Sequence, residues 1–337
     1  MLIEENKSLK PFTSFGSNEI SRYFITVTSI DALLEAITWA KEKNIPYSIL
    51  GAGSNVLFTK PFEGLVIKIE IVGIVKTNET AAEVYLNVGA GEHWHHFVCY
   101  CVQKGWGGIE NLSLIPGTVG ASAIQNIGAY GVEVQEAIAS VTAVDTVSQQ
   151  LINFTNEACK FSYRNSLFKK EKNRYIVTSV QFILHKQPTL RTEYGNIKET
   201  LREKGIKNPS LEDLSNAIIQ IRTAKLPDPS KLKNAGSFFK NPTISIFEFE
   251  KLKTRFPKII AYPISNDLYK VSAEWLIAYC GWKGCKKGNV GCHEKQSLVI
   301  VNYGDATGKE IFNFSEEIIQ SVFTELAILL EREVEVY

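Results

Sequence analysis

The sequence predicts an α+β fold in which short strands form mixed or antiparallel sheets. Two observations lead to this prediction. Between residues 65 and 184, β-rich segments follow one another with few helices between them, and the region lacks the regular strand–helix alternation of a doubly wound sheet. At 337 residues, the chain is also long enough for two or three domains with cores of their own.

The first 50 residues predict a strand followed by a helix. Residues 24–27 are rich in aromatic and β-branched side chains, which is typical of a strand. Ser29 or Thr28 can then cap a helix. The apolar stripe of that helix repeats at helical spacing over Ile30, Leu33, Leu34, Ile37 and Ala40.

A buried strand within residues 46–58 opens into the turn Gly51-Ala52-Gly53-Ser54-Asn55. This turn half-resembles a dinucleotide fingerprint, but Val56 stands where the third glycine belongs. Pro61 follows soon after, and no helix is expected here whose N-terminus could face a phosphate. A classical Rossmann domain is therefore disfavoured, whereas a strand–turn–strand phosphate clamp stays open.

The middle of the chain predicts further strands at residues 65–77, 84–90, 138–144 and 175–184, with one helix at about 94–104. A helix then runs from residue 211 through 221 and ends before Pro227 and Pro229, which enforce an extended backbone. We expect a domain boundary here. Beyond it, the pattern predicts helices near 246–256, 271–280 and 309–329 and a strand at 297–302.

Residues 115–131 are the most informative segment of the chain. They include the glycines Gly117, Gly120, Gly128 and Gly131 and no charged residue, so we expect a poor helix or strand here. Backbone N–H groups in glycine turns bind phosphate oxygens, and the amides of Gln125 and Asn126 suit a flat heteroaromatic edge. The segment therefore predicts a dinucleotide site, with a long mobile surface loop as the alternative.

Composition narrows the function class. The net charge of +1 gives no field for nucleic acid or for a membrane surface, and no apolar run is long enough to span a bilayer. The first ten residues lack the apolar core of a signal peptide. We therefore expect a soluble cytoplasmic protein.

The six cysteines and the cluster His93, His95 and His96 offer no paired ligand spacing. Cys285, Cys292 and His293 could be imagined as a second ligand set. In a cytosolic chain, buried reduced thiols are the default. We expect no metal site.

A second motif covers residues 234–242 and contains Ser237. The hydrolase elbow Gly-x-Ser-x-Gly is absent, because Phe239 stands where its second glycine belongs. Taken by itself, Ser237 is best explained as a residue that caps or supports a turn.

The two motifs together resemble the flavin-dependent UDP-N-acetylenolpyruvoylglucosamine reductases of bacterial cell-wall synthesis. The matching pieces occur in family order across nearly the whole chain. They are Phe15-Gly16 and residues 50–55, 110–131, 163–166, 222–229, 234–242 and 331–334.

The resemblance implies a vanillyl-alcohol-oxidase-type FAD-binding fold made of two subdomains, residues 1–64 and 65–222. A smaller α+β substrate-binding domain would cover residues 226–327, and residues 328–337 would form a strand returning to the FAD-binding part. It also implies a two-stage reaction. NADPH reduces FAD and leaves, and hydride then passes to the enolpyruvyl group of a UDP-sugar, giving UDP-N-acetylmuramate.

The resemblance also implies roles for individual residues. Ser237 would be the proton donor, while Arg164 and Glu333 would polarise the substrate carboxylate and steady the enol. Noncovalent FAD binding would fall to Gly51, Ala52, Gly53, Ser54, Asn55, Gly117, Gly120, Ala121, Ser122, Gln125, Asn126, Gly128 and Arg222. The UDP-sugar would contact Tyr194, Lys225, Asn241, Tyr262, Lys283 and Gln296, with Tyr262 and Tyr194 marking one of two family subtypes.

Three departures and two alternatives accompany this resemblance. Asn165 stands where Asp is common, Cys285 follows the Lys283-Gly284 pair, and only four residues follow Glu333 to anchor it. The alternatives are another FAD oxidoreductase of the same cofactor fold and a UDP-sugar-binding protein without flavin. A monomer that binds no nucleic acid or membrane is expected in either case.

Overall fold

The computed structural model describes all 337 residues, which form two compact units. Unit 1 comprises Met1–Lys7, Ser21–Ala52 and Glu63–Ala224. Unit 2 comprises Ser8–Ile20, Gly53–Phe62 and Lys225–Tyr337. Unit 2 is therefore assembled from stretches that lie far apart in the sequence, and the finer division at residues 64 and 222 stays a prediction.

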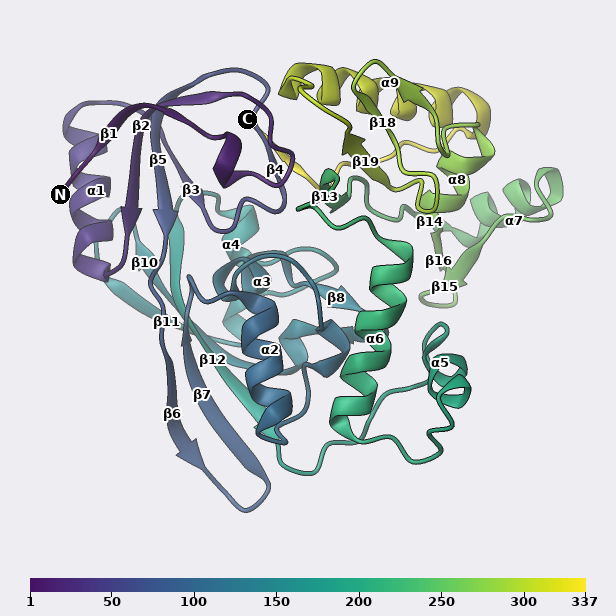
Figure 1. Cartoon of the computed structure of the whole chain (residues 1–337), viewed down its shortest axis with the longest axis horizontal. Coiled ribbons are helices and arrows are strands. Elements are labelled where there is room, and N and C mark those ends of the chain that lie inside the picture. Colours follow the sequence, from purple (N-terminus) through teal and green to yellow (C-terminus); the bar gives the residue numbers. More distant parts are fainter. The chain divides into compact units, whose positions relative to one another are not determined.

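Unit 1 contains a four-stranded sheet of order β1 (Glu4–Ser8), β2 (Ile20–Val27), β5 (Phe62–Ile69) and β3 (Tyr47–Leu50). Strands β3 and β5 pair in parallel. Helix α1 (Ile30–Glu42) lies beside this sheet (Figure 1) and buries Leu33, Ala36, Ile37 and Ala40 in the same core. The Ser29 hydroxyl accepts from Ala32 N and caps the helix, which confirms the predicted strand, stripe and cap.

A five-stranded antiparallel sheet forms the other layer of unit 1. Its order is β11 (Leu151–Thr155), β10 (Ile138–Asp145), β12 (Tyr175–His185), β7 (Glu83–Gly89) and β6 (Ile74–Glu79). Helix α2 (Trp94–Gln103) packs on it, with the Phe97 ring centred 4.9 Å from that of Phe182. The mixture of antiparallel and parallel pairing confirms the α+β fold class.

The remaining helices of unit 1 are short, apart from α6. They are α4 (Leu167–Lys170), α5 (Ile197–Glu203) and α6 (Leu211–Lys225), with 3-10 turns at Glu110–Leu112, Val134–Glu136 and Glu157–Cys159. Helices α5 and α6 share a small core that includes Leu201 and Leu214. Helix α6 extends to the residue before Leu226-Pro227, because a residue that precedes proline is disfavoured in a helix.

One prediction about residues 115–131 was wrong, because the segment holds a helix, α3 (Val119–Gln125), and the strand β8 (Gly128–Ala129), which pairs with β9 (Val132–Glu133). The Thr118 hydroxyl caps α3. Packing outweighs the cost of glycine within the helix, since a Cβ on Gly120 would lie 2.7 Å from the Cβ of Ala90. The helix ends at Asn126, whose φ is 43°.

Unit 2 contains two small sheets with three helices, in addition to a two-stranded pair at the C-terminus. One sheet has the order β13 (Lys233–Ser237), β19 (Val299–Asn302), β18 (Val290–Cys292) and β17 (Lys286–Lys287), and the other has β14 (Thr243–Ser245), β16 (Leu268–Val271) and β15 (Ala261–Pro263). Figure 1 shows α9 (Gly308–Leu326) and α8 (Ala273–Tyr279) beside the first sheet and α7 (Ile246–Arg255) beside the second. The predicted helices and strand of this region are confirmed.

The C-terminal end of the chain pairs with a strand from its first 60 residues in unit 2. The C-terminal strand β20 (Glu335–Val336) pairs in parallel with β4 (Val56–Leu57), and the Tyr337 ring stacks on Phe58 with centroids 5.0 Å apart. The 3-10 turn at Lys10–Phe12 also belongs to this unit. No helix of the chain has both the length and the apolar character needed to cross a membrane.

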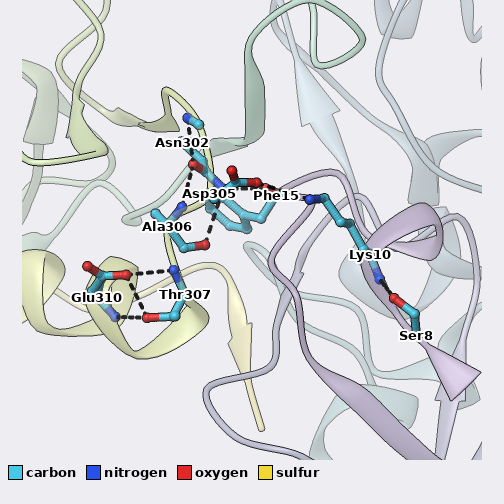
Figure 2. A network of polar contacts seen from close by, with 9 residues as sticks. Ser8, Lys10, Phe15, Asn302, Asp305, Ala306, Thr307 and Glu310 are labelled. Carbon is cyan, nitrogen blue, oxygen red and sulfur yellow. Dashed lines mark hydrogen bonds and ion pairs between the residues drawn. The ribbon is translucent and has the colours of Figure 1, made fainter. Parts of the chain in front are cut away.

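Asn302 fixes the N-terminal segment of unit 2 to its C-terminal body (Figure 2). Its amide nitrogen donates to the Phe15 carbonyl at 3.0 Å, and its amide oxygen accepts from the N–H groups of Gly304 and Ala306 at 3.0 and 3.2 Å. An ion pair between Lys10 and Asp305 at 3.1 Å lies in the same network. Because Asn302 is buried, these hydrogen bonds are shielded from competing water.

We expect Asn302→Ala to lower the free energy of unfolding by about 2–4 kcal/mol, because it leaves several buried backbone groups without partners. Urea unfolding measures the change. Asn313→Ala, at an exposed position of α9, is the control and should shift stability by less than about 0.5 kcal/mol. Equal effects of the two substitutions would contradict a structural role for Asn302.

Candidate active site

Two glycines of unit 1 let backbone segments approach each other closely. A Cβ on Gly51 would lie 2.9 Å from the Thr118 hydroxyl oxygen, and one on Gly120 would overlap Ala90. No larger side chain fits without displacing a neighbour. We call the close contacts of Gly51 with Thr118 and of Gly120 with Ala90 the glycine cradle.

A half-buried arginine in unit 1 lacks a partner for one of its donors. The Arg222 Nε atom is buried and makes no hydrogen bond. Burial lowers the pKa of this guanidinium, Tyr130 opposes that shift, and the positive charge of Arg164 lowers it further. Arg222 is half-buried, and an anion beside its unused donor would offset both the burial and the like-charged neighbour.

Arg164 lies at the tip of a tight turn in unit 1. Ser162 and Asn165 pair across this turn, which holds Arg164 at a left-handed φ of 54°. The guanidinium Nη2 donates to the Gly128 carbonyl at 2.6 Å, and a Cβ on Gly128 would lie only 3.0 Å from Nη1. Gly128 thus leaves room for the arginine, and the structure brings these two predicted site residues together.

The Asn126 amide is occupied by the chain itself. Its nitrogen donates to Glu133 Oε2 at 2.9 Å and to the Ser162 carbonyl at 3.0 Å, and its oxygen accepts from Gln135 N at 3.2 Å. The side chain therefore holds the Arg164 turn, instead of reading a heteroaromatic edge as the sequence suggested. The Ser122 hydroxyl is likewise bonded, to the Val119 carbonyl at 2.7 Å, and the backbone N–H groups of residues 119–122 all donate to acceptors within the chain.

Tyr194 stands at the surface of unit 1, with 53% of the residue exposed. Its ring meets that of Tyr130 edge-on at 6.4 Å and lies against Gly131. Arg191 holds the same loop by donating to the Gly131 carbonyl at 3.0 Å. The loop carrying Tyr194 is therefore attached to the end of the glycine-rich segment.

In unit 2, the second half of the glycine turn packs on a pair of hydroxyls that sequence reasoning missed. Gly53 has a φ of 62°, and a Cβ there would lie 1.8 Å from the Phe12 carbonyl oxygen. Ser14 N donates to the Gly53 carbonyl at 3.0 Å. The hydroxyls of Thr13 and Ser14 are buried without partners, so both are available to a ligand, and only their place just before Phe15-Gly16 signals this in the sequence.

Ser237 ends strand β13 at an irregularity in its pairing with β19. The turn before it is made by Asn234, whose side-chain oxygen accepts from Gly236 N at 2.9 Å, and by Gly236, whose φ is 71°. The half-buried Ser237 hydroxyl has no hydrogen-bond partner in the chain. The turn therefore does not need this hydroxyl, which argues against the turn-supporting interpretation.

The backbone of Glu333 is fixed beside Ser237. Glu333 N donates to the Phe238 carbonyl at 2.8 Å, and the Glu333 carbonyl accepts from the Asn55 amide at 3.1 Å. Lys240 N donates to the Glu331 carbonyl at 2.9 Å. These bonds bring Ser237, Glu333 and Asn55 together in unit 2, and with β20 they anchor Glu333 although only four residues follow it.

The predicted UDP-sugar contacts in unit 2 differ in their surroundings. The Asn241 side-chain oxygen accepts from Ala273 N at 2.9 Å, so part of its amide holds the start of α8. Lys225 pairs with Glu274 at 3.5 Å, and Gln296 is buried. Lys283 is exposed, and Tyr262 is 54% exposed on β15, where both could meet a ligand from solvent.

The histidines do not form a metal centre. The rings of His93 and His96 lie 4.4 Å apart on α2, but no group of three or more His, Cys, Asp or Glu side chains is placed to hold a metal ion. All six cysteines are free thiols, and burial raises the pKa of Cys159 and Cys292 to about 12.

Comparison with protein families matches two parts of the chain. Residues 21–151 match an FAD binding domain, and residues 228–337 match the C-terminal domain of UDP-N-acetylenolpyruvoylglucosamine reductase. The FAD match spans the cradle around Gly51 and Gly120, and the second match spans Ser237 and Glu333. The tight cradle and the unused donor of Arg222 fit the phosphates and polar edges of FAD.

Full-length relatives agree with both matches. The chain is 44% identical to the UDP-N-acetylenolpyruvoylglucosamine reductase of Amoebophilus asiaticus, over 100% of this chain and 99% of that protein. It is 41% identical to the protein of that name in Pseudomonas aeruginosa, over 99% of each. The crystal structure of the Thermus caldophilus reductase superposes with a TM-score of 0.69 at 25% identity, covering 100% of this chain and 99% of that one. The chain therefore belongs to the UDP-N-acetylenolpyruvoylglucosamine reductase family.

Proposed function

We propose that this protein reduces the enolpyruvyl group of UDP-N-acetylenolpyruvoylglucosamine to give UDP-N-acetylmuramate, with NADPH as the electron donor and Ser237 as the proton donor. Family membership and the FAD domain support the general activity, which is flavin-dependent reduction in peptidoglycan precursor synthesis. The unpaired Ser237 hydroxyl beside Glu333 is the observation that supports Ser237 as the proton donor.

The chemistry requires a proton donor and fixed polar groups. FAD, when bound, accepts hydride from NADPH and delivers it to the terminal alkene carbon of the substrate. Negative charge then develops on the carbon next to the carboxylate, and this enolate-like charge needs cationic or hydrogen-bonding groups. The same carbon must finally receive a proton from a positioned acid.

Ser237 suits the role of that acid. Its hydroxyl is half-buried and unpaired, and it is held on a rigid turn that Asn234 builds. A serine hydroxyl is a weak acid, so it needs polar or charged groups nearby to stabilise the oxygen it leaves behind. A cation such as Lys225 would supply that stabilisation. We assign Glu333, which the backbone pairing brings beside Ser237, to polarising the substrate carboxylate and steadying the enol.

Arg164 suits the stabilisation of negative charge. The turn fixes its backbone, the Gly128 carbonyl fixes one end of its guanidinium, and Asn126 holds the turn from behind. A guanidinium anchored in this way needs little reorganisation to meet a carboxylate. We assign Arg164 to the enolpyruvyl carboxylate.

FAD is held by the glycine cradle and by backbone groups around it. We assign Gly51 to Asn55 and the segment from Gly117 to Gly128 to this role, with Arg222 supplying the positive charge. Thr13 and Ser14 join this set, because their hydroxyls are buried and unpaired. We also propose that the protein works as a monomer in the cytoplasm, where NADPH is available.

For the substrate's UDP part we propose six residues, of which Gln296 is buried and the other five are at least partly exposed. We assign Tyr194, Lys225, Asn241, Tyr262, Lys283 and Gln296 to it. Lysines at such positions act as point charges on a diphosphate, and an exposed tyrosine offers a flat face to a uracil ring or sugar.

We expect Ser237→Ala to leave the reduction of bound flavin by NADPH nearly unchanged and to slow its reoxidation by the enolpyruvyl substrate about 10²–10⁴-fold, because only the second step needs a proton at the substrate carbon. Stopped-flow flavin absorbance measures both steps. Ser230→Ala, at an exposed serine of the same unit, is the control. Equal slowing of both steps would mean that Ser237 shapes the flavin site instead.

The purified protein should be yellow, and acid precipitation should release all its flavin into solution, because backbone groups and noncovalent contacts hold the cofactor. Absorbance of the supernatant and of the pellet measures the two fractions. Flavin that stays with the pellet would contradict noncovalent binding and would point to a covalent link, with His93, His95 or His96 as the first positions to map.

If Tyr262 closes on the bound nucleotide, Tyr262→Ala should weaken the enolpyruvyl substrate by about 1–3 kcal/mol, the cost of a lost aromatic contact. Tyr262→Phe keeps the ring and should retain most of the affinity. Titration of the oxidised enzyme by calorimetry measures both. An alanine variant that binds as tightly as the parent would exclude this role.

A further inference from the structure

Four hydrogen bonds connect the N-terminal end of α2 to residues 112–119, at the start of the glycine-rich segment. Trp94 Nε1 donates to the Leu112 carbonyl at 2.9 Å, and Trp94 N donates to the Gly117 carbonyl at 3.0 Å. Val119 N donates to the Glu92 carbonyl at 2.9 Å. In the fourth bond, Leu114 N donates to His95 Nδ1 at 2.9 Å.

The fourth bond differs from the others because its acceptor is titratable. The Leu114 N–H can be accepted only if His95 Nδ1 carries a free lone pair, so the ring must be neutral with its proton on Nε2. Leu114 itself has a φ of 58°, a left-handed conformation that is strained for a non-glycine residue. The imidazole therefore holds the chain in a conformation that it would otherwise leave.

The surroundings of His95 favour the neutral ring. Burial lowers its pKa below the ordinary value, and the charges of His93, His96 and Arg222 lower it further. Cys99, whose sulfur lies 3.6 Å from His95 Nε2, has its pKa raised by burial and stays a thiol.

The carboxylates on the elements next to His95 are engaged elsewhere. Glu92 accepts from Gly73 N at 2.7 Å, and Glu110 accepts from Gly108 N at 2.6 Å. Helix α3 carries no ionisable side chain. No carboxylate pairs with His95 to stabilise its charged form.

We propose that His95 is a positioning residue that keeps the segment from Leu114 to Gly120 in its FAD-binding conformation, and that it makes FAD retention depend on pH. The inference rests on the cofactor role proposed above for Gly117 and Gly120. It assigns His95 no contact with the flavin.

The sign of the pH dependence follows from the bond. When pH falls below the pKa of His95, both ring nitrogens become donors, and the ring can no longer accept from Leu114. The flavin-binding conformation then requires loss of one proton, so FAD affinity falls by at most about tenfold per pH unit. Above that pKa, the affinity should be flat.

The test measures the FAD dissociation constant of the flavin-stripped protein by fluorescence quenching between pH 8 and pH 5. His95→Asn places an amide oxygen near the position of Nδ1 and cannot titrate, so it should bind within about threefold of the parent at pH 8 and lose the acid slope. His95→Leu removes the acceptor and should weaken FAD at least about tenfold at every pH. His185→Asn, at an exposed position of β12, is the control and should behave as the parent.

A second readout does not depend on flavin. The ¹⁵N shifts of the His95 ring should report a neutral ring with its proton on Nε2 at pH 7.5, and its titration should coincide with the acid slope of FAD binding. A ring charged or protonated on Nδ1 at that pH would overturn the inference, whether or not the protein binds FAD. So would an acid slope that persists in His95→Asn, or full affinity in His95→Leu with an unchanged melting temperature. Failure of the parent to bind FAD at pH 8 would instead overturn the cofactor assignment.

Discussion

The backbone pairing between residues 238–240 and 331–333 is the constraint on which the proposed chemistry of unit 2 depends. It joins the strand that carries Ser237 to the end of the chain, which is about 90 residues away in sequence, and it fixes Glu333 through two bonds of its own backbone. One of these bonds comes from Asn55, which lies in the glycine turn. The proposed proton donor Ser237, Glu333 and part of the glycine turn are therefore linked by one set of hydrogen bonds.

In unit 1, hydrogen bonds also fix the backbone around Arg164. Asn126 is buried, its backbone has a left-handed conformation, and its side-chain amide hydrogen-bonds the turn that carries Arg164. Gly128 supplies both a carbonyl and the space that the guanidinium needs. Positive charge is thus concentrated at Arg164 and Arg222 at an electrostatic cost that an anionic ligand relieves. The protein reaches this local charge although its net charge is only +1.

Much of the fold could be predicted because its signals are local. Spacing within a few residues predicts the apolar stripe of α1 and its Ser29 cap. It also predicts the strands of the five-stranded sheet and the long amphipathic helix α9. Helix α3 could not be predicted, since the packing of Gly120 on Ala90 is a long-range contact that hides the helical signal behind glycine. The residue types of the site were recognisable from motifs, but the hydrogen-bond partners of these residues were not. The engaged amide of Asn126, the unpaired hydroxyls of Thr13 and Ser14, and the bond from Leu114 to His95 all arise from tertiary structure.

We propose that this chain couples NADPH oxidation to reduction of an enolpyruvyl UDP-sugar. The most direct measurement follows NADPH absorbance in the presence and in the absence of that sugar, with mass spectrometry of the sugar product. We expect rapid oxidation only with the sugar, one NADPH consumed per sugar and a product heavier by two hydrogens. Oxidation at the same rate without the sugar, or with an unchanged sugar at the end, would contradict it and would favour an oxidase of the same cofactor fold.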